Sequence, residues 1–285
     1  MHPTLPSWKV LLADDEDGSR LLLSRILSHL GQSVSACADG LQAWSHIQET
    51  TFDLVLLDRR MPGLDGVELA RRLRDLRADP VSWMRKVPWV AIFSVPSPAG
   101  QSADWEEGHA AGVDAWLTRP LLLDQVRQLL QVLAAQERSN GRLWTGAGWQ
   151  ESPSRTLTEP SPREACFFNP APLERYLTDL GPERLRPVLA QALRTLEEAG
   201  PRLSQATPDQ WMSLAHKLRG SCASSGLEAL ADLAARLESR AQAGDTAACI
   251  PLLEQLAPAL STGHDAVLRW QRDRLPGGAA PPGAA

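Results

Sequence analysis

The sequence predicts two domains of different class, a doubly wound α/β domain followed by an all-α four-helix bundle. In the first half, short uninterrupted apolar runs alternate with helical patterns, as expected of a parallel sheet covered by helices on both faces. In the second half, four amphipathic segments follow one another. A stretch that contains glycine, proline and serine without periodicity lies between the halves and is typical of a linker. With 285 residues, the chain is long enough for two hydrophobic cores.

Buried parallel strands are expected at residues 9–13 and 54–57, because both are continuous apolar runs that end at acidic residues. Helical patterns follow or precede these runs at residues 17–30, 40–49 and 66–78. Asp65 and Glu68 can form a capping box at the start of the third of these helices. The alternation of strand and helix indicates a doubly wound sheet.

Three aspartates follow the two expected strands directly. Asp14 and Asp15 end the first apolar run, and Asp58 ends the second. In a doubly wound sheet the functional crevice lies outside the carboxyl ends of the strands, at the point where the strand order reverses. Three carboxylates at that point would repel one another unless a hard cation such as Mg²⁺ took oxygen ligands from them. The sequence therefore predicts a magnesium site.

The first half resembles the receiver domain of response regulators over about residues 7–136. The matching residues are the pair Asp14-Asp15, Asp58 with the loop that follows it to residue 66, Ser94 after an apolar run, and Trp116 before the segment 117–120. The resemblance implies a flavodoxin-like fold with five parallel strands in the order 2-1-3-4-5.

The resemblance also implies a role for each matching residue. Asp58 would accept the phosphoryl group as an acyl phosphate, and Asp14 and Asp15 would hold Mg²⁺ together with Asp58. The backbone carbonyl of Arg60 would add a ligand, and Ser94 would form a hydrogen bond with the phosphoryl group.

Arg119 departs from the family, which has lysine at this position. Arginine presents a longer planar fork where lysine presents a compact charge, so the two do not fill a phosphate pocket equally. The chain contains only three lysines among 29 basic residues, which favours a general drift toward arginine as one explanation. The other explanation is altered function, and it leads to an alternative in which the first domain is a pseudo-receiver that mediates interaction or dimerisation without being phosphorylated.

His216 lies on an amphipathic helix in the second half. Thr207 to Gln210 can form a capping box with proline at the first helical position, so a helix is expected to begin just before Trp211. At about 100° per residue, His216 points away from the apolar stripe and is expected to face water. The stripe consists of Trp211, Leu214, Leu218 and Cys222. Arg219 is close enough to assist an incoming phosphoryl group.

This helix resembles the acceptor helix of the histidine-phosphotransfer (HPt) domain. The family pattern of histidine, leucine, a basic residue, glycine and a small residue is met by His216, Leu218, Arg219, Gly220 and Ser221. Further amphipathic segments near 182–200, 225–242 and 247–270 fit an antiparallel four-helix bundle, expected over residues 166–272. The resemblance implies that His216 accepts a phosphoryl group. A linker is expected at 137–165 and a disordered tail at 273–285.

Composition restricts the other functional classes. The net charge of −5 and the lack of a basic cluster with interleaved aromatics argue against direct nucleic-acid binding. Four widely spaced cysteines without metal-ligand spacing favour a reduced protein, and no apolar run is long enough to span a membrane. The first residues do not have the pattern of a signal sequence. We therefore expect a cytoplasmic protein, with an oligomeric state that the sequence leaves open.

The two resemblances together imply a two-component phosphorelay protein. It would pass phosphoryl groups between Asp58 and His216 and would have a sensor histidine kinase and response regulators as partners. The sequence contains no nucleotide loop of the Walker type and nothing like the ATP-binding boxes of histidine kinases. We therefore expect a phosphotransfer signalling protein that does not phosphorylate itself from ATP.

Overall fold

The computed structural model describes residues 5–78, 88–94, 107–135 and 167–275. Contacts divide the chain into two compact units, Met1–Ala165 and Cys166–Ala285. The predicted linker at 137–165 and most of the predicted tail at 273–285 lie outside the described residues. The finer limits of 7–136 and 166–272 stay predictions.

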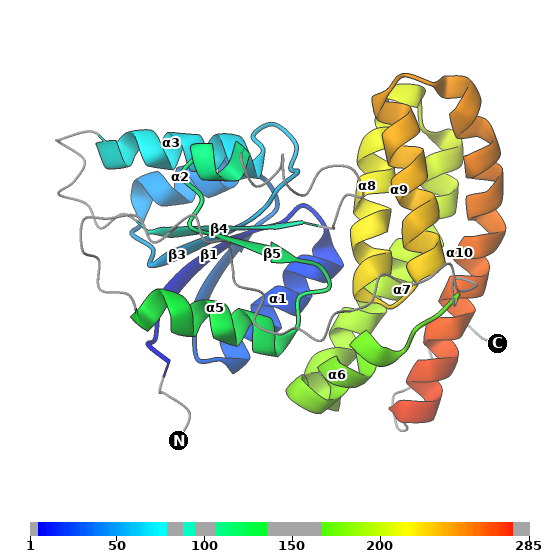
Figure 1. Cartoon of the computed structure of the whole chain (residues 1–285). Coiled ribbons are helices and arrows are strands. Elements are labelled where there is room, and N and C mark those ends of the chain that lie inside the picture. The colour runs from blue at the N-terminus through cyan, green and yellow to red at the C-terminus, as the bar shows by residue number, and fades with distance from the viewer. Residues whose placement is uncertain (1–4, 79–87, 95–106, 136–166, 276–285) are drawn as a thin grey trace. The chain divides into compact units, whose positions relative to one another are not determined.

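The first unit is built on a five-stranded parallel sheet in the order β2-β1-β3-β4-β5, which confirms the expected topology. Figure 1 shows the strands side by side between two layers of helices. The central strands β1 and β3 are apolar because helices cover both of their faces. The strands are β1 (Lys9–Ala13), β2 (Ser33–Cys37), β3 (Leu54–Asp58), β4 (Trp89–Ser94) and β5 (Ala115–Thr118).

Three helices of this unit, α1, α2 and α3, begin and end close to the predicted limits, and α5 is a further helix for which no limits are predicted. Contacts join α1 to α5 on one face of the sheet and α2 to α3 on the other (Figure 1). The cap predicted for α3 is present, since the backbone N–H of Glu68 donates to Asp65 Oδ1 at 2.7 Å. The helices are α1 (Asp17–His29), α2 (Gly40–Glu49), α3 (Gly66–Ala78) and α5 (Leu123–Ala135).

The second unit is a helical bundle, as expected. Helices α7 to α10 pack against one another, and α6 is a short additional helix that the sequence analysis does not predict. The bundle consists of α6 (Ala171–Leu180), α7 (Pro182–Gln205), α8 (Pro208–Ser224), α9 (Glu228–Gln242) and α10 (Thr246–Arg274). None of the helices in the described ranges is both long and apolar enough to cross a lipid bilayer.

Helix α8 begins where its sequence predicts and buries three residues of the predicted stripe, while the fourth, Leu214, is half-buried. The backbone N–H of Thr207 donates to Gln210 Oε1 at 3.0 Å, which is half of the expected capping box. Trp211, Leu218 and Cys222 are buried in the bundle core. This orientation places the opposite side of α8, which carries His216, away from that core.

The beginning of the bundle is attached to the turn between α8 and α9. Gly226 has a φ of 72°, and its carbonyl accepts a hydrogen bond of 2.7 Å from the backbone N–H of Asn169. The side chain of Asn169 donates to Glu228 at the start of α9 (2.8 Å) and accepts from the backbone N–H of Ala171 at the start of α6 (3.0 Å). The chain entering α6 is therefore fixed to the α8–α9 turn.

Candidate functional site

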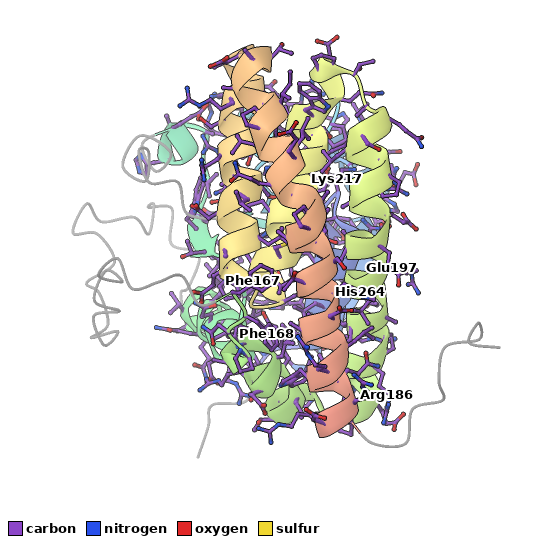
Figure 2. The ribbon with its side chains drawn as sticks, turned by 90° about the vertical axis from the view of Figure 1, so that its right-hand side faces the viewer. Phe167, Phe168, Arg186, Glu197, Lys217 and His264 are labelled. Atoms are coloured by element: carbon purple, nitrogen blue, oxygen red, sulfur yellow. The ribbon has the colours of Figure 1, made fainter. Side chains whose placement is uncertain are left out.

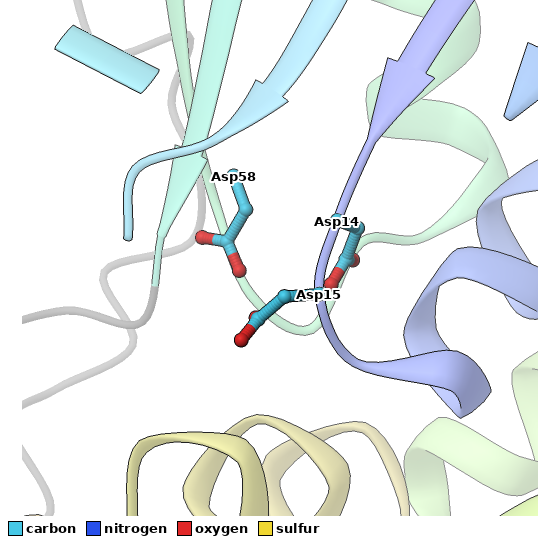
Figure 3. Close-up of side chains that lie close together, drawn as sticks. All are labelled: Asp14, Asp15 and Asp58. Carbon is cyan, nitrogen blue, oxygen red and sulfur yellow. The ribbon is translucent and has the colours of Figure 1, made fainter. Parts of the chain in front are cut away.

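The three aspartates singled out in the sequence converge at one edge of the sheet. Strands β1 and β3 are parallel neighbours in which Ala13 pairs with Leu57, so the residues that follow them leave the sheet together. One carboxylate oxygen from each of Asp14, Asp15 and Asp58 lies within 4.8 Å of the others. Figure 3 shows these side chains close together beyond the ends of the strands. We call these three residues the acidic cluster.

The acidic cluster fits a divalent cation. Its donors are carboxylate oxygens, which Mg²⁺ prefers, and Asp14 and Asp58 are buried, so their charges are poorly screened. A fourth carboxylate, that of Glu16, lies nearby and caps α1 by accepting hydrogen bonds from Gly18 and Ser19. Burial, and secondarily the charge of Asp14, raises the pKa of Glu16 to about 7. Binding of a cation beside Glu16 would favour the ionised form of this carboxyl group.

Arg119 brings a positive charge directly into the cluster. Its Nη2 atom donates to Asp14 Oδ2 at 2.8 Å and to Asp58 Oδ2 at 3.2 Å. The guanidinium carbon lies 4.8 Å from the centre of the Phe93 ring. Burial lowers the pKa of Arg119, but the carboxylates of Asp14 and Asp58 outweigh this effect and raise it above its ordinary value. Arg119 is therefore a permanent cation at this site.

A second anchor holds Arg119 from the side of α1. Its Nη1 atom donates to Oγ of Ser19, a residue of the first turn of α1 that the sequence analysis does not single out. Its backbone N–H donates to the carbonyl of Ser94 at 2.9 Å, which places β5 in register with β4. Arg119 therefore connects strands and helix around the acidic cluster.

Ser94 ends β4, and its hydroxyl group is bonded to Trp116. The indole Nε1 of Trp116 donates to Ser94 Oγ at 3.1 Å. Arg59, which follows Asp58, lies with its guanidinium carbon 5.8 Å from the centre of the Trp116 ring and forms an ion pair of 3.2 Å with Glu107. Ser94 and Trp116, two separate positions of the receiver resemblance, are therefore in contact.

Arg60 follows Asp58 by two positions in the loop after β3. Its backbone carbonyl stays a predicted ligand.

In the bundle, His216 is paired with a carboxylate. Its Nδ1 atom lies 2.8 Å from Oε1 of Glu238 on α9, and its side chain is 19% exposed. The other oxygen of Glu238 accepts a hydrogen bond of 2.9 Å from Arg219, which lies one turn after His216 on α8. The expectation that His216 simply faces water is therefore incomplete, because α9 supplies a partner on the side of the helix that faces away from the core.

The pairing with Glu238 favours one tautomer of the His216 ring. An ionised carboxylate only accepts hydrogen bonds, so the proton of the neutral ring lies on Nδ1. The lone pair of the neutral ring is then on Nε2.

Another histidine of the bundle forms a similar pair on a different surface. His264 on α10 lies 2.9 Å through Nε2 from Glu197 on α7, and both residues are labelled in Figure 2. Here the bonded atom is Nε2, whereas in His216 it is Nδ1. His264 therefore serves as an internal comparison for His216.

Comparisons with known proteins identify two domains. Residues 10–131 match the response regulator receiver domain, and residues 183–270 match the Hpt domain. The virulence sensor protein BvgS of Bordetella parapertussis is 29% identical over 278 residues, which cover 94% of this chain and 21% of that protein. The sensory/regulatory protein RpfC of Xanthomonas campestris pv. campestris is 28% identical over 265 residues, which cover 92% of this chain and 34% of that protein.

The chain thus spans between about a fifth and a third of the length of these curated relatives. Among solved structures, the receiver domain of the Francisella response regulator 1452 is 26% identical, with a TM-score of 0.39, and the match covers 45% of this chain and 96% of that one.

Proposed function

The chain joins a response-regulator receiver domain to an Hpt domain and so belongs to the two-component phosphorelay proteins, and we propose that Asp58 and His216 are its phosphoryl acceptors. The observation that supports the proposal is that each of the two candidate acceptors lies beside charged side chains suited to its chemistry. Asp58 belongs to the acidic cluster with Arg119 beside it, and His216 presents Nε2 while Nδ1 is held by Glu238.

The proposed chemistry is in-line displacement at phosphorus. When phosphohistidine is the donor, the bond between phosphorus and Nε2 breaks, and a bond between phosphorus and a carboxylate oxygen of Asp58 or of a partner's aspartate forms. The electron pair of the broken bond returns to Nε2. Mg²⁺ bound to the acidic cluster would neutralise charge on the transferring group, and Arg119 would add a second positive charge. In this proposal a sensor histidine kinase supplies the phosphoryl group, and response regulators exchange it with the chain.

The pseudo-receiver alternative is not supported over this function. It depends on the arginine at position 119, but Arg119 keeps a positive charge within 3.2 Å of Asp58, and the three carboxylates of the acidic cluster are together.

Phosphorylation of the wild-type chain tests the proposal directly. With Mg²⁺ and a small phosphodonor such as phosphoramidate, we expect two phosphates of different stability. The phosphate on Asp58 should be sensitive to base and hydroxylamine, and the phosphate on His216 should be stable in base and labile in acid. Peptide mapping by mass spectrometry locates both. Label on His216 alone would favour the pseudo-receiver, and label on neither residue would contradict the proposal.

The contact between Glu238 and His216 predicts a graded effect on phosphotransfer. Glu238→Ala removes the acceptor that fixes the ring tautomer, so the transfer rate through His216 should fall by about tenfold or more, as for other histidines that lose an orienting carboxylate. Glu238→Gln retains an acceptor oxygen without the charge, so its transfer rate should lie between those of wild type and Glu238→Ala. Single-turnover transfer from phosphorylated chain to a receiver measures the rates, and ¹⁵N chemical shifts of the ring report the tautomer.

The matched control is Glu197→Ala, which removes the corresponding partner of His264. It should leave the transfer rate unchanged. Equal rates in Glu238→Ala and wild type would show that Glu238 has no positioning role.

A further inference from the structure

Arg119 engages the same carboxylate oxygens that a divalent cation needs. Both oxygens of Asp14 accept a hydrogen bond, Oδ1 one of 2.9 Å from the backbone N–H of Glu16 and Oδ2 one of 2.8 Å from Arg119. The same nitrogen of Arg119 reaches Asp58 Oδ2 at 3.2 Å. The guanidinium thus lies between two of the three members of the acidic cluster.

The position of Arg119 does not depend on the carboxylates alone. Ser19 accepts from its other terminal nitrogen, and Phe93 packs against the guanidinium at 4.8 Å. Because the fork is planar and its nitrogens have fixed separations, these anchors hold Nη2 at the cluster. The side chain is only 3% exposed, so water provides little competing solvation. A lysine has a single nitrogen, whereas Arg119 bonds to Ser19 through Nη1 and to both aspartates through Nη2.

We propose that Arg119 is a resident cation that competes with Mg²⁺ for the acidic cluster, so that the metal binds only as the guanidinium is displaced from Asp14. Binding a divalent ion next to a fixed positive charge is unfavourable. In addition, the carboxylate oxygens of Asp14 and Asp58 already accept hydrogen bonds from Arg119. The consequence for phosphorylation of Asp58, which rests on the proposed function, is that this step requires a higher magnesium concentration than the same cluster would need with lysine at position 119.

Magnesium affinity of the full chain, measured by isothermal titration calorimetry without any phosphodonor, tests this proposal. Arg119→Lys keeps a positive charge and all three carboxylates but loses the fork. It should bind Mg²⁺ about tenfold more tightly, a factor that corresponds to ~1.4 kcal/mol. Ser19→Ala removes one anchor and leaves charge and carboxylates unchanged, so its affinity should rise by a smaller factor. Arg74→Lys, the same substitution at an exposed arginine bonded to Asp75, is the matched control and should bind like wild type.

An affinity of Arg119→Lys that is equal to or lower than that of wild type overturns the proposal. If this variant does not fold, Ser19→Ala decides in the same way. The thermal unfolding temperature gives a second readout, since Mg²⁺ should raise it at lower concentration in the two variants than in wild type. Tighter metal binding without phosphate on Asp58 would leave this inference standing and remove the proposed function. Phosphorylation of Asp58, together with equal magnesium affinities of wild type and Arg119→Lys, would support the proposed function and overturn this inference.

Discussion

Replacing His216 with glutamine is expected to eliminate the phosphate that is stable in base and labile in acid from the chain. Glutamine is similar in size and can still form a hydrogen bond with Glu238, but its amide nitrogen is not a nucleophile. Phosphotransfer between this bundle and partner receivers should fall below detection, while phosphate on Asp58 from a small phosphodonor should persist. Because His216 lies outside the bundle core, helical circular dichroism should be unchanged, and the free energy of unfolding should change by less than about 1 kcal/mol.

His264→Gln is the matched control for this loss. It makes the same substitution in the same bundle and also leaves a glutamate without its histidine, since His264 pairs with Glu197. It should retain full labelling and transfer. Base-stable, acid-labile phosphate that persists in His216→Gln and disappears in His264→Gln would show that the acceptor is His264, and its persistence in both variants would place the acceptor elsewhere.

The strands that carry the acidic cluster are predictable from sequence because their signals are local. Apolar runs of four residues and more end at Asp14 and Asp58, and such runs are typical of strands buried on both faces. The rule that ligands bind beyond the carboxyl ends of parallel strands then brings the aspartates together. The helix of His216 is predictable for a similar reason, since the cap at Thr207 and the apolar stripe lie within one segment.

The partners of these residues are not predictable by the same means, because they come from distant segments. Arg119 contacts Ser19 and Asp14 across about a hundred positions of sequence, and its departure from lysine indicates a change without indicating where the longer side chain goes. Glu238 carried a weaker signal. Glu238 lies 12 residues after Gly226, and His216 lies 10 residues before Gly226. Two antiparallel helices joined at this turn would therefore place Glu238 and His216 at similar heights. A charged residue next to the apolar stripe of α9 then needs a partner.

Replacing Gly226 with alanine is expected to destabilise the bundle by about 2–4 kcal/mol, which is large for a single methyl group. Two effects combine. The φ of 72° is unfavourable for any residue with a Cβ atom, at about 1 kcal/mol. In addition, a Cβ atom at this position would lie 1.9 Å from the carbonyl oxygen of Asn169, so the segment before α6 must move and the hydrogen bond of 2.7 Å between Asn169 and Gly226 is lost.

Gly244→Ala separates the two effects. Gly244 has nearly the same φ, 70°, in the turn between α9 and α10, but no atom lies within 4 Å of a Cβ atom built there. This control should lose only the conformational contribution of about 1 kcal/mol. Hydrogen exchange of α8 and α9 in the full chain measures the stability of the bundle in both variants, and exchange of β1 and β3 shows whether the first unit is affected.

If the two variants lose equal stability, the contact between Asn169 and the α8–α9 turn does not contribute, and the start of the bundle is held by α6 itself. In α6, Glu174 accepts a hydrogen bond of 2.9 Å from Trp270 of α10 and forms an ion pair of 3.0 Å with Arg274 of the same helix. These contacts would then attach α6 to the bundle.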